Sequence, residues 1–243
     1  MLRITRTVAL STLALGASLS GCAENESSLF VEGVLNLSAS DCVARPDAQA
    51  EFLAQGVLDT AFANGYVAAV QVGNQVTEQG NREKIRTETS RMHLEGATGT
   101  VFGVDQSEHS FDAIATGFVH PATGTDPGIS AMFVQLINDE VLGQLGGEGQ
   151  IVVRFRVFGT TLGGQEIESG DYDFPIFLCN GCLIDYPLEA DDVAVAGYQC
   201  AISAEVTQEA RICFRGQDQH FPCSACAAVS GICTDPTQNP WYN

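Results

Sequence analysis

The stretch "IVVRFRVFGTTLGGQEIESGDYDFPIFLC", residues 151–179, decides the fold class of this chain. Apolar and polar residues alternate on both sides of Gly163-Gly164, and this alternation is typical of half-buried β-strands. A two-residue turn at the glycine pair would join the two runs into a β-hairpin. We therefore predict a hairpin in which the numbers of facing residues sum to 327.

In this register apolar residues face apolar residues, and arginines face aspartates. Each such cross-strand pair contributes about 0.2–1 kcal/mol, and a slip by one residue would set charged side chains against apolar ones. A structural role for the two arginines is therefore favoured over an anion-binding role. The predicted pairs are Val153–Phe174, Phe155–Tyr172, Arg154–Asp173 and Arg156–Asp171.

Similar short runs, separated by Gly, Asn, Asp and Pro, recur about every ten residues on the N-terminal side of the hairpin. They favour an all-β chain with an antiparallel β-sandwich, immunoglobulin-like or similar, over residues 29–188. Helix is expected at residues 46–55 and in a short turn at 139–145, and residues 188–214 could form a helix or another hairpin. The expected strands lie at 29–37, on either side of a hairpin turn at Asn64-Gly65, and at 86–94, 98–104, 110–119 and 131–137.

The composition changes after Asp185, and five cysteines lie in the last 44 residues. A segment this short needs covalent staples to hold a fold. We therefore predict a small disulfide-rich C-terminal module over residues 189–243, packed against the sandwich.

The N-terminus has the pattern of an export signal. Arg3 and Arg6 precede an uncharged run from Thr7 to Leu19, which is too short to span a bilayer as a helix. The run ends in the sequence Leu-Ser-Gly-Cys at residues 19–22. An aliphatic residue, two small residues and a cysteine at this position resemble the lipobox of bacterial lipoproteins.

This resemblance covers residues 1–28 and implies the fate of the N-terminus. Residues 1–21 would be a signal peptide, Cys22 would carry fatty acids such as palmitate, and residues 22–28 would be a short tether. Several acyl chains together anchor a protein stably to a membrane. In such lipoproteins an aspartate after the cysteine means retention at the inner membrane, so Ala23 implies the outer membrane, on its periplasmic or surface face.

The charge balance limits the partners. The chain has a formal net charge of −19, and removal of Arg3 and Arg6 with the leader makes it −21. So acidic a surface argues against nucleic acid as a partner. Four positive charges gather at Arg82, Lys84, Arg86 and Arg91, where they could contact lipopolysaccharide phosphates or an acidic envelope protein; a solvated strand edge is the simpler reading.

Eight cysteines remain once Cys22 is assigned to lipid. An even number in an oxidising compartment predicts disulfides, with a connectivity that the sequence leaves open. The two C-x-x-C pairs at 179–182 and 223–226 leave a second hypothesis, an envelope thiol-redox or metal-binding protein. The disulfide candidates are Cys42, Cys179, Cys182, Cys200, Cys213, Cys223, Cys226 and Cys233.

No catalytic signature is found, and no cofactor is expected beyond the covalent lipid. The chain contains no nucleophile elbow, P-loop or zinc-protease motif. The four histidines are widely separated, and the acidic groups match no calcium loop. Trp241 and Tyr242 could serve as an interface anchor or could pack back onto the cysteine-rich module. We therefore expect a non-enzymatic, lipid-anchored envelope protein with a binding or structural role.

Overall fold

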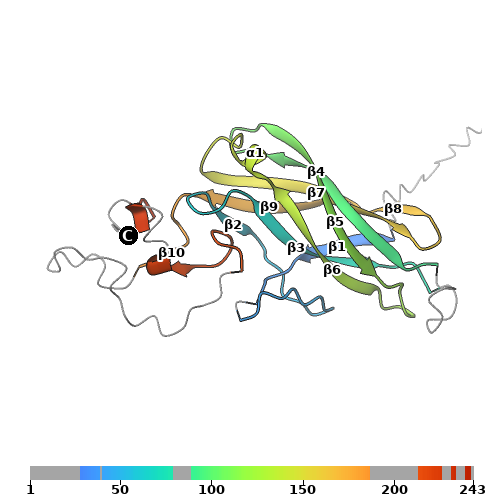
Figure 1. Cartoon of the computed structure of the whole chain (residues 1–243). Coiled ribbons are helices and arrows are strands. Elements are labelled where there is room, and N and C mark those ends of the chain that lie inside the picture. Colours follow the sequence, from blue (N-terminus) through green and yellow to red (C-terminus); the bar gives the residue numbers. More distant parts are fainter. Residues whose placement is uncertain are drawn as a thin grey trace, which may run out of the picture.

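A computed structural model describes residues 28–38, 40–78, 89–186, 213–225, 231–233 and 239–241. Two β-sheets pack face to face as a sandwich (Figure 1). The three-stranded sheet has the order β1-β3-β6, with β1 Leu29–Val34, β3 Tyr66–Asn74 and β6 Gly128–Ile137. The six-stranded sheet has the order β2-β9-β7-β4-β5 with β8 beside β7: β2 Gly56–Asp59, β9 Tyr172–Cys179, β7 Gly149–Thr161, β4 Met92–Phe102, β5 Glu108–Val119 and β8 Glu166–Glu168.

The chain is all-β, as predicted. Strand pairs in both sheets are antiparallel except that of β2 with β9, which is parallel and makes the larger sheet mixed. Apolar side chains from the inner faces of the two sheets form one continuous core. Burying such a side chain stabilises a fold by about 1.5–3 kcal/mol. Among the largest fully buried side chains are those of Tyr66, Leu94, Met132, Phe155 and Phe174.

The register predicted for residues 151–179 is confirmed. Val153 faces Phe174 and Phe155 faces Tyr172. The charged pairs also form on the outer face: Arg154 Nε lies 2.7 Å from Asp173 Oδ1, and Arg156 Nη2 lies 2.7 Å from Asp171 Oδ1.

The prediction of a two-residue turn was wrong. Thr161 N–H donates to the Gln165 carbonyl, so the loop has three residues, 162–164, and Gly164 adopts a φ of +85°. Hairpin loops of this length use a left-handed residue, which glycine supplies without strain. Next to the turn, the residue numbers of facing pairs sum to 326. Farther from the turn, one extra residue opposite Arg156 restores the predicted sum of 327.

Two predictions for residues 46–65 were also wrong. Residues 46–55 contain no helix, because Phe52 pairs with Leu35 and Leu53 N–H donates to the Val34 carbonyl. Asn64-Gly65 closes no hairpin, because β2 and β3 belong to different sheets. Gly65 instead allows a close approach of two backbone segments, because a Cβ at this position would lie 2.5 Å from the Ile137 carbonyl oxygen.

Segments 86–94 and 98–104 were expected as two strands, but Met92–Phe102 is one strand, β4, with a register shift between Leu94 and Gly96. The short helical turn was correct. Helix α1, Asp139–Leu142, follows β6, and the Asn138 side chain caps it by accepting a hydrogen bond from Val141 N–H. No helix among the described residues has the length and hydropathy needed to span a bilayer.

A second, smaller core lies at one end of the sandwich. It contains β10 Ile184–Asp185, which pairs in parallel with β11 Phe221–Pro222, and the 3-10 turns η2 Cys223–Ala225 and η3 Gly231–Cys233. The ring of Phe221 meets that of Phe62 edge to face at 5.0 Å. This small core therefore packs on the loop between β2 and β3, and it lies at the opposite end from β8 (Figure 1).

Candidate functional site at the Cys179–Cys182 loop

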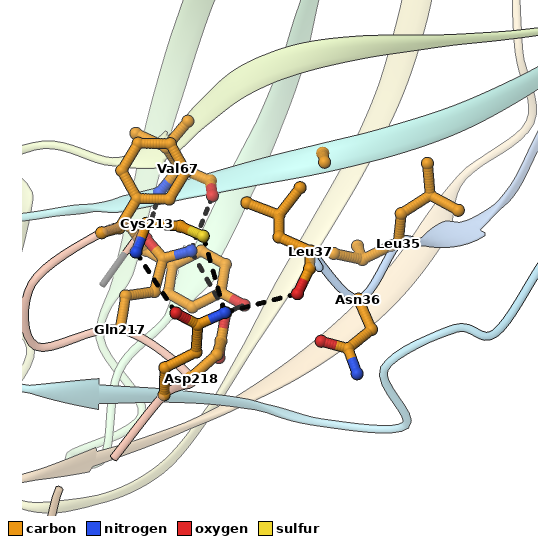
Figure 2. A pocket seen from close by; sticks show the side chains of 12 residues that line it. Leu35, Asn36, Leu37, Val67, Cys213, Gln217 and Asp218 are labelled. Atoms are coloured by element: carbon orange, nitrogen blue, oxygen red, sulfur yellow. Dashed lines mark hydrogen bonds between the residues drawn. The ribbon is translucent and has the colours of Figure 1, made fainter. Parts of the chain in front are cut away.

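Residues 213–219 fasten the C-terminal segment to the sandwich. A disulfide joins Cys213 to Cys42, which is 171 residues earlier in the chain. The Gln217 side chain then pairs with both backbone groups of Val67, accepting from N–H at 2.9 Å and donating to the carbonyl at 2.8 Å (Figure 2). Because β1 ends at Val34, opposite Val70, the amide of Gln217 takes the place of a neighbouring strand beside Val67.

Asp218 joins the same segment to β2. Its carboxylate accepts hydrogen bonds from Val57 N–H at 2.8 Å and from the Tyr66 hydroxyl at 2.8 Å. Burial, the largest influence, raises the pKa of Asp218, although these hydrogen bonds act in the opposite direction. Burial also raises the pKa of the Tyr66 hydroxyl, and the nearby Asp218 charge adds to this effect.

The hollow drawn in Figure 2 lies between this segment and the ends of β1 and β3. Its free volume is about 10 Å³, which is room for about one water molecule. It is therefore too small for an organic ligand. We call Gln217 and Asp218, with their contacts to β2 and β3, the C-terminal clasp.

The C-x-x-C pair at the end of β9 lies next to the clasp. Cys179 and Cys182 form a disulfide, and Gly181 between them has a φ of +90°. The fully buried carboxylate of Asp59 accepts hydrogen bonds from Gly181 N–H at 2.7 Å and from Leu183 N–H at 3.1 Å. The backbone of the loop is thus folded around one buried acidic group.

Two further residues hold this loop from other sides. Thr60 donates to the Cys179 carbonyl from both its N–H and its Oγ1, each at 2.8 Å. Asn239 is buried, and its Nδ2 donates to the Gly181 carbonyl at 2.8 Å. The loop is therefore fixed by hydrogen bonds from both a sandwich turn and the C-terminal tail, in addition to its disulfide.

Asp59, Cys179 and Cys182 form a compact chemical group. One carboxylate oxygen and the two sulfur atoms all lie within 4.8 Å of one another. Cys179 is fully buried and Cys182 is partly exposed. With the sulfurs joined in a disulfide they offer no thiolate to a metal, but a reduced pair would place two thiols beside a carboxylate.

Six of the eight predicted cysteines are disulfide-bonded in the structure: Cys42, Cys179, Cys182, Cys213, Cys223 and Cys233. Cys22, Cys200 and Cys226 lie outside the described residues, as do Arg82, Lys84 and Arg86 of the basic patch. Arg91 is described, and its guanidinium lies 4.8 Å from the centre of the Phe118 ring.

The other residues singled out in the sequence lie apart from the loop, except Trp241 and His220. The Trp241 ring meets Phe177 of β9 edge to face at 5.5 Å and is 42% exposed. His220 pairs with Asp185 at 3.0 Å and so joins β11 to β10. His93 stacks on Phe118 at 4.8 Å, and His109 lies 2.9 Å from Ser107.

The sequence reasoning missed Asp59, Gln217, Asp218 and Asn239. Asp59 was taken as part of a hairpin, and the other three lie in polar segments that carry no motif. Asp59, Gln217 and Asp218 each bind backbone groups more than 100 positions away in the chain. No local sequence pattern signals contacts of this kind.

No protein-family model and no curated protein matches the chain. Among solved structures, it is similar to the solution structure of a protein described as a late embryogenesis abundant (LEA) protein. The two are 9% identical with a TM-score of 0.29, over 57% of this chain and 74% of that one. A likeness this weak carries no argument about function.

The buried carboxyl of Asp218 predicts a pH dependence of stability. The pKa of Asp218 is raised in the folded state, so its protonated carboxyl contributes to the free energy of unfolding. This contribution is fully present below the pKa of the unfolded state, near 4, and is lost as the pH rises through the pKa of the folded state. Relative to Asp218→Asn, the native protein should lose about 1.4 kcal/mol of unfolding free energy across this window for each unit of pKa difference.

Urea denaturation at a series of pH values measures this difference. The exposed Asp112→Asn controls for the loss of one negative charge. Parallel pH profiles for native protein and Asp218→Asn would show that the carboxyl is not perturbed by burial.

Proposed function

We propose that this chain is a lipid-anchored protein of the bacterial cell envelope, held at the outer membrane through Cys22, with a non-enzymatic binding or structural role. The observation that carries the proposal is the leader: two arginines, an uncharged run and Leu-Ser-Gly-Cys at residues 19–22. Ala23 favours the outer membrane. The covalent lipid is the only cofactor that this function needs.

The position of Ser28 supports a definite orientation for an anchored chain. Its carbonyl accepts from Gln75 N–H, just after β3 ends, and the Asn74 side chain donates to the Ser90 carbonyl. Leu162 in the hairpin turn donates to the Arg91 carbonyl at this same end. A lipid on Cys22 would therefore hold the β8 end of the sandwich toward the bilayer (Figure 1).

The opposite end would then face away from the membrane. Strand β7 has 13 residues, which corresponds to about 43 Å. It runs from Gly149, which pairs with Leu178 beside the C-x-x-C loop, to Thr161 beside the turn at Leu162. In this orientation the sandwich is a spacer that presents the small second core and the exposed Trp241 to a partner protein.

The basic patch fits this orientation. Arg91 lies at the end where the anchored chain would enter the sandwich, and the chain leaves the described structure at Glu78 and returns at Thr89, both near that end. The segment between them contains Arg82, Lys84 and Arg86. In this orientation Arg91 would lie near the bilayer, where a cation in a strongly acidic protein can contact phosphates of lipid headgroups or lipopolysaccharide.

Replacing Cys22 by Ser tests the anchor. The native protein should fractionate with outer membranes, and Cys22→Ser should fractionate with soluble envelope proteins, because the acceptor of the lipid is gone. Ala23→Asp is the matched control: it keeps the lipid and should move the protein to inner membranes. Membrane association of Cys22→Ser at the native level would contradict lipid anchoring.

Energy transfer from tryptophan to a headgroup-labelled lipid tests the orientation. In phosphatidylethanolamine and phosphatidylglycerol vesicles, the double variant Trp241→Phe, Leu162→Trp should transfer more efficiently than the native protein, whose single tryptophan is Trp241. Phe retains a ring against Phe177, and Leu162 is 46% exposed, so both changes suit their sites. Equal or stronger transfer from Trp241 would contradict the orientation.

A further inference from the structure

The two disulfides with known partners differ in what they hold together. Cys42–Cys213 spans 171 residues and Cys179–Cys182 spans three. In the loop-closure model a bond that closes a longer loop stabilises the fold more, so Cys42–Cys213 contributes more to stability than Cys179–Cys182. The shorter bond also closes a loop that Asp59, Thr60 and Asn239 already fix by hydrogen bonds. The loop can therefore keep its shape when Cys179–Cys182 is reduced.

A buried carboxylate lies beside the shorter bond. Asp59 is fully buried and lies within 4.8 Å of both sulfurs. A carboxylate disfavours a second negative charge on a sulfur beside it. Since a disulfide becomes more oxidising when its reduced thiolate is stabilised, this carboxylate should have the opposite effect and make the pair reducing.

The two sulfurs also differ in access. Cys182 is partly exposed and Cys179 is fully buried. Cys182 packs against the small second core but keeps part of its surface open, so an incoming disulfide or thiol should react first at Cys182, and Cys179 should react with the sulfur of Cys182.

We propose that Cys179 and Cys182 form a thiol–disulfide exchange site that reduces a disulfide in a second protein. Cys182 gives its thiol proton to solvent. The Cys182 thiolate attacks one substrate sulfur, the substrate S–S bond breaks, and the first substrate thiolate leaves and takes up a proton from solvent. Cys179 then attacks Cys182, and its proton passes to the second substrate thiolate, which leaves. Two electrons pass to the substrate, the Cys179–Cys182 bond forms, and a dithiol reductant restores the pair.

This activity goes beyond the proposed function and is independent of it. Loss of anchoring in Cys22→Ser would leave the exchange chemistry unchanged. Failure of the exchange site would in turn leave the anchor and the orientation of the sandwich intact.

Equilibration of the detergent-solubilised mature protein with reduced and oxidised dithiothreitol tests the site. Alkylation and peptide mass spectrometry would report the reduced fraction of Cys179 and Cys182, and circular dichroism would report the sandwich. We expect a reversible two-electron titration of this pair in folded protein. Reduction that occurs only together with unfolding would overturn the proposal, and so would uptake of one zinc ion by the reduced pair in place of exchange.

Asp59→Asn tests the role of the carboxylate. Removing the negative charge should shift the exchange constant with dithiothreitol toward the dithiol by at least about tenfold, or about 30 mV. Asn239→Ala is the matched control, because it loosens the same loop through the Gly181 carbonyl without a change of charge. Equal shifts in the two variants would reduce Asp59 to a purely structural role and sink the proposed chemistry.

Single-cysteine variants keep the proposal testable if Asp59→Asn fails to fold. In Cys179→Ser, the accessible Cys182 thiol should form a mixed disulfide with oxidised glutathione at least about tenfold faster than Cys179 does in Cys182→Ser. Equal rates would contradict the assigned order of attack, and no mixed disulfide in either variant would overturn the site.

Discussion

The sandwich depends on the hydrogen bonds that satisfy backbone N–H and carbonyl groups at the open edges of β2 and β3. Strand β2 has a free edge opposite β9, and β3 extends past the point where β1 ends. The segment from Gly216 to Asp218 lies between them: its backbone and the Asp218 side chain bind β2, and the Gln217 side chain binds Val67 of β3. Unpaired backbone groups buried here would each cost about 1–3 kcal/mol, so the C-terminal segment is a structural part of the sandwich.

Asp59 connects this clasp to the candidate site. Its backbone N–H donates to the Gly216 carbonyl, and its side chain accepts from the backbone of the C-x-x-C loop. The same residue therefore takes part in closing the sandwich and in forming the environment of the Cys179–Cys182 bond. Were the pair reduced as we propose, the hydrogen bonds to Asp59 would keep the loop attached to the rigid strand.

The sequence predicts the fold where local patterns and cross-strand chemistry agree. The hairpin register followed from the match of apolar and charged pairs between Val153–Arg156 and Asp171–Phe174, which holds although the turn differs from the expected one. The helix expected at residues 46–55 failed because pairing of Phe52 with Leu35, just after β1, overrides local propensity. The candidate site was half predicted: the cysteine pair is visible as a motif, whereas Asp59 and Asn239 reach it only through tertiary contacts.

Amide hydrogen exchange of the folded protein tests the clasp most directly. The N–H groups of Val57 and Val67 donate to the Asp218 and Gln217 side chains, respectively. Both should exchange about as slowly as core amides of β7, and Gln217→Ala should speed exchange at Val67 more than at Val57. Rapid exchange of both amides in the native protein, at rates typical of exposed loops, would contradict the claim that the C-terminal segment closes the sandwich.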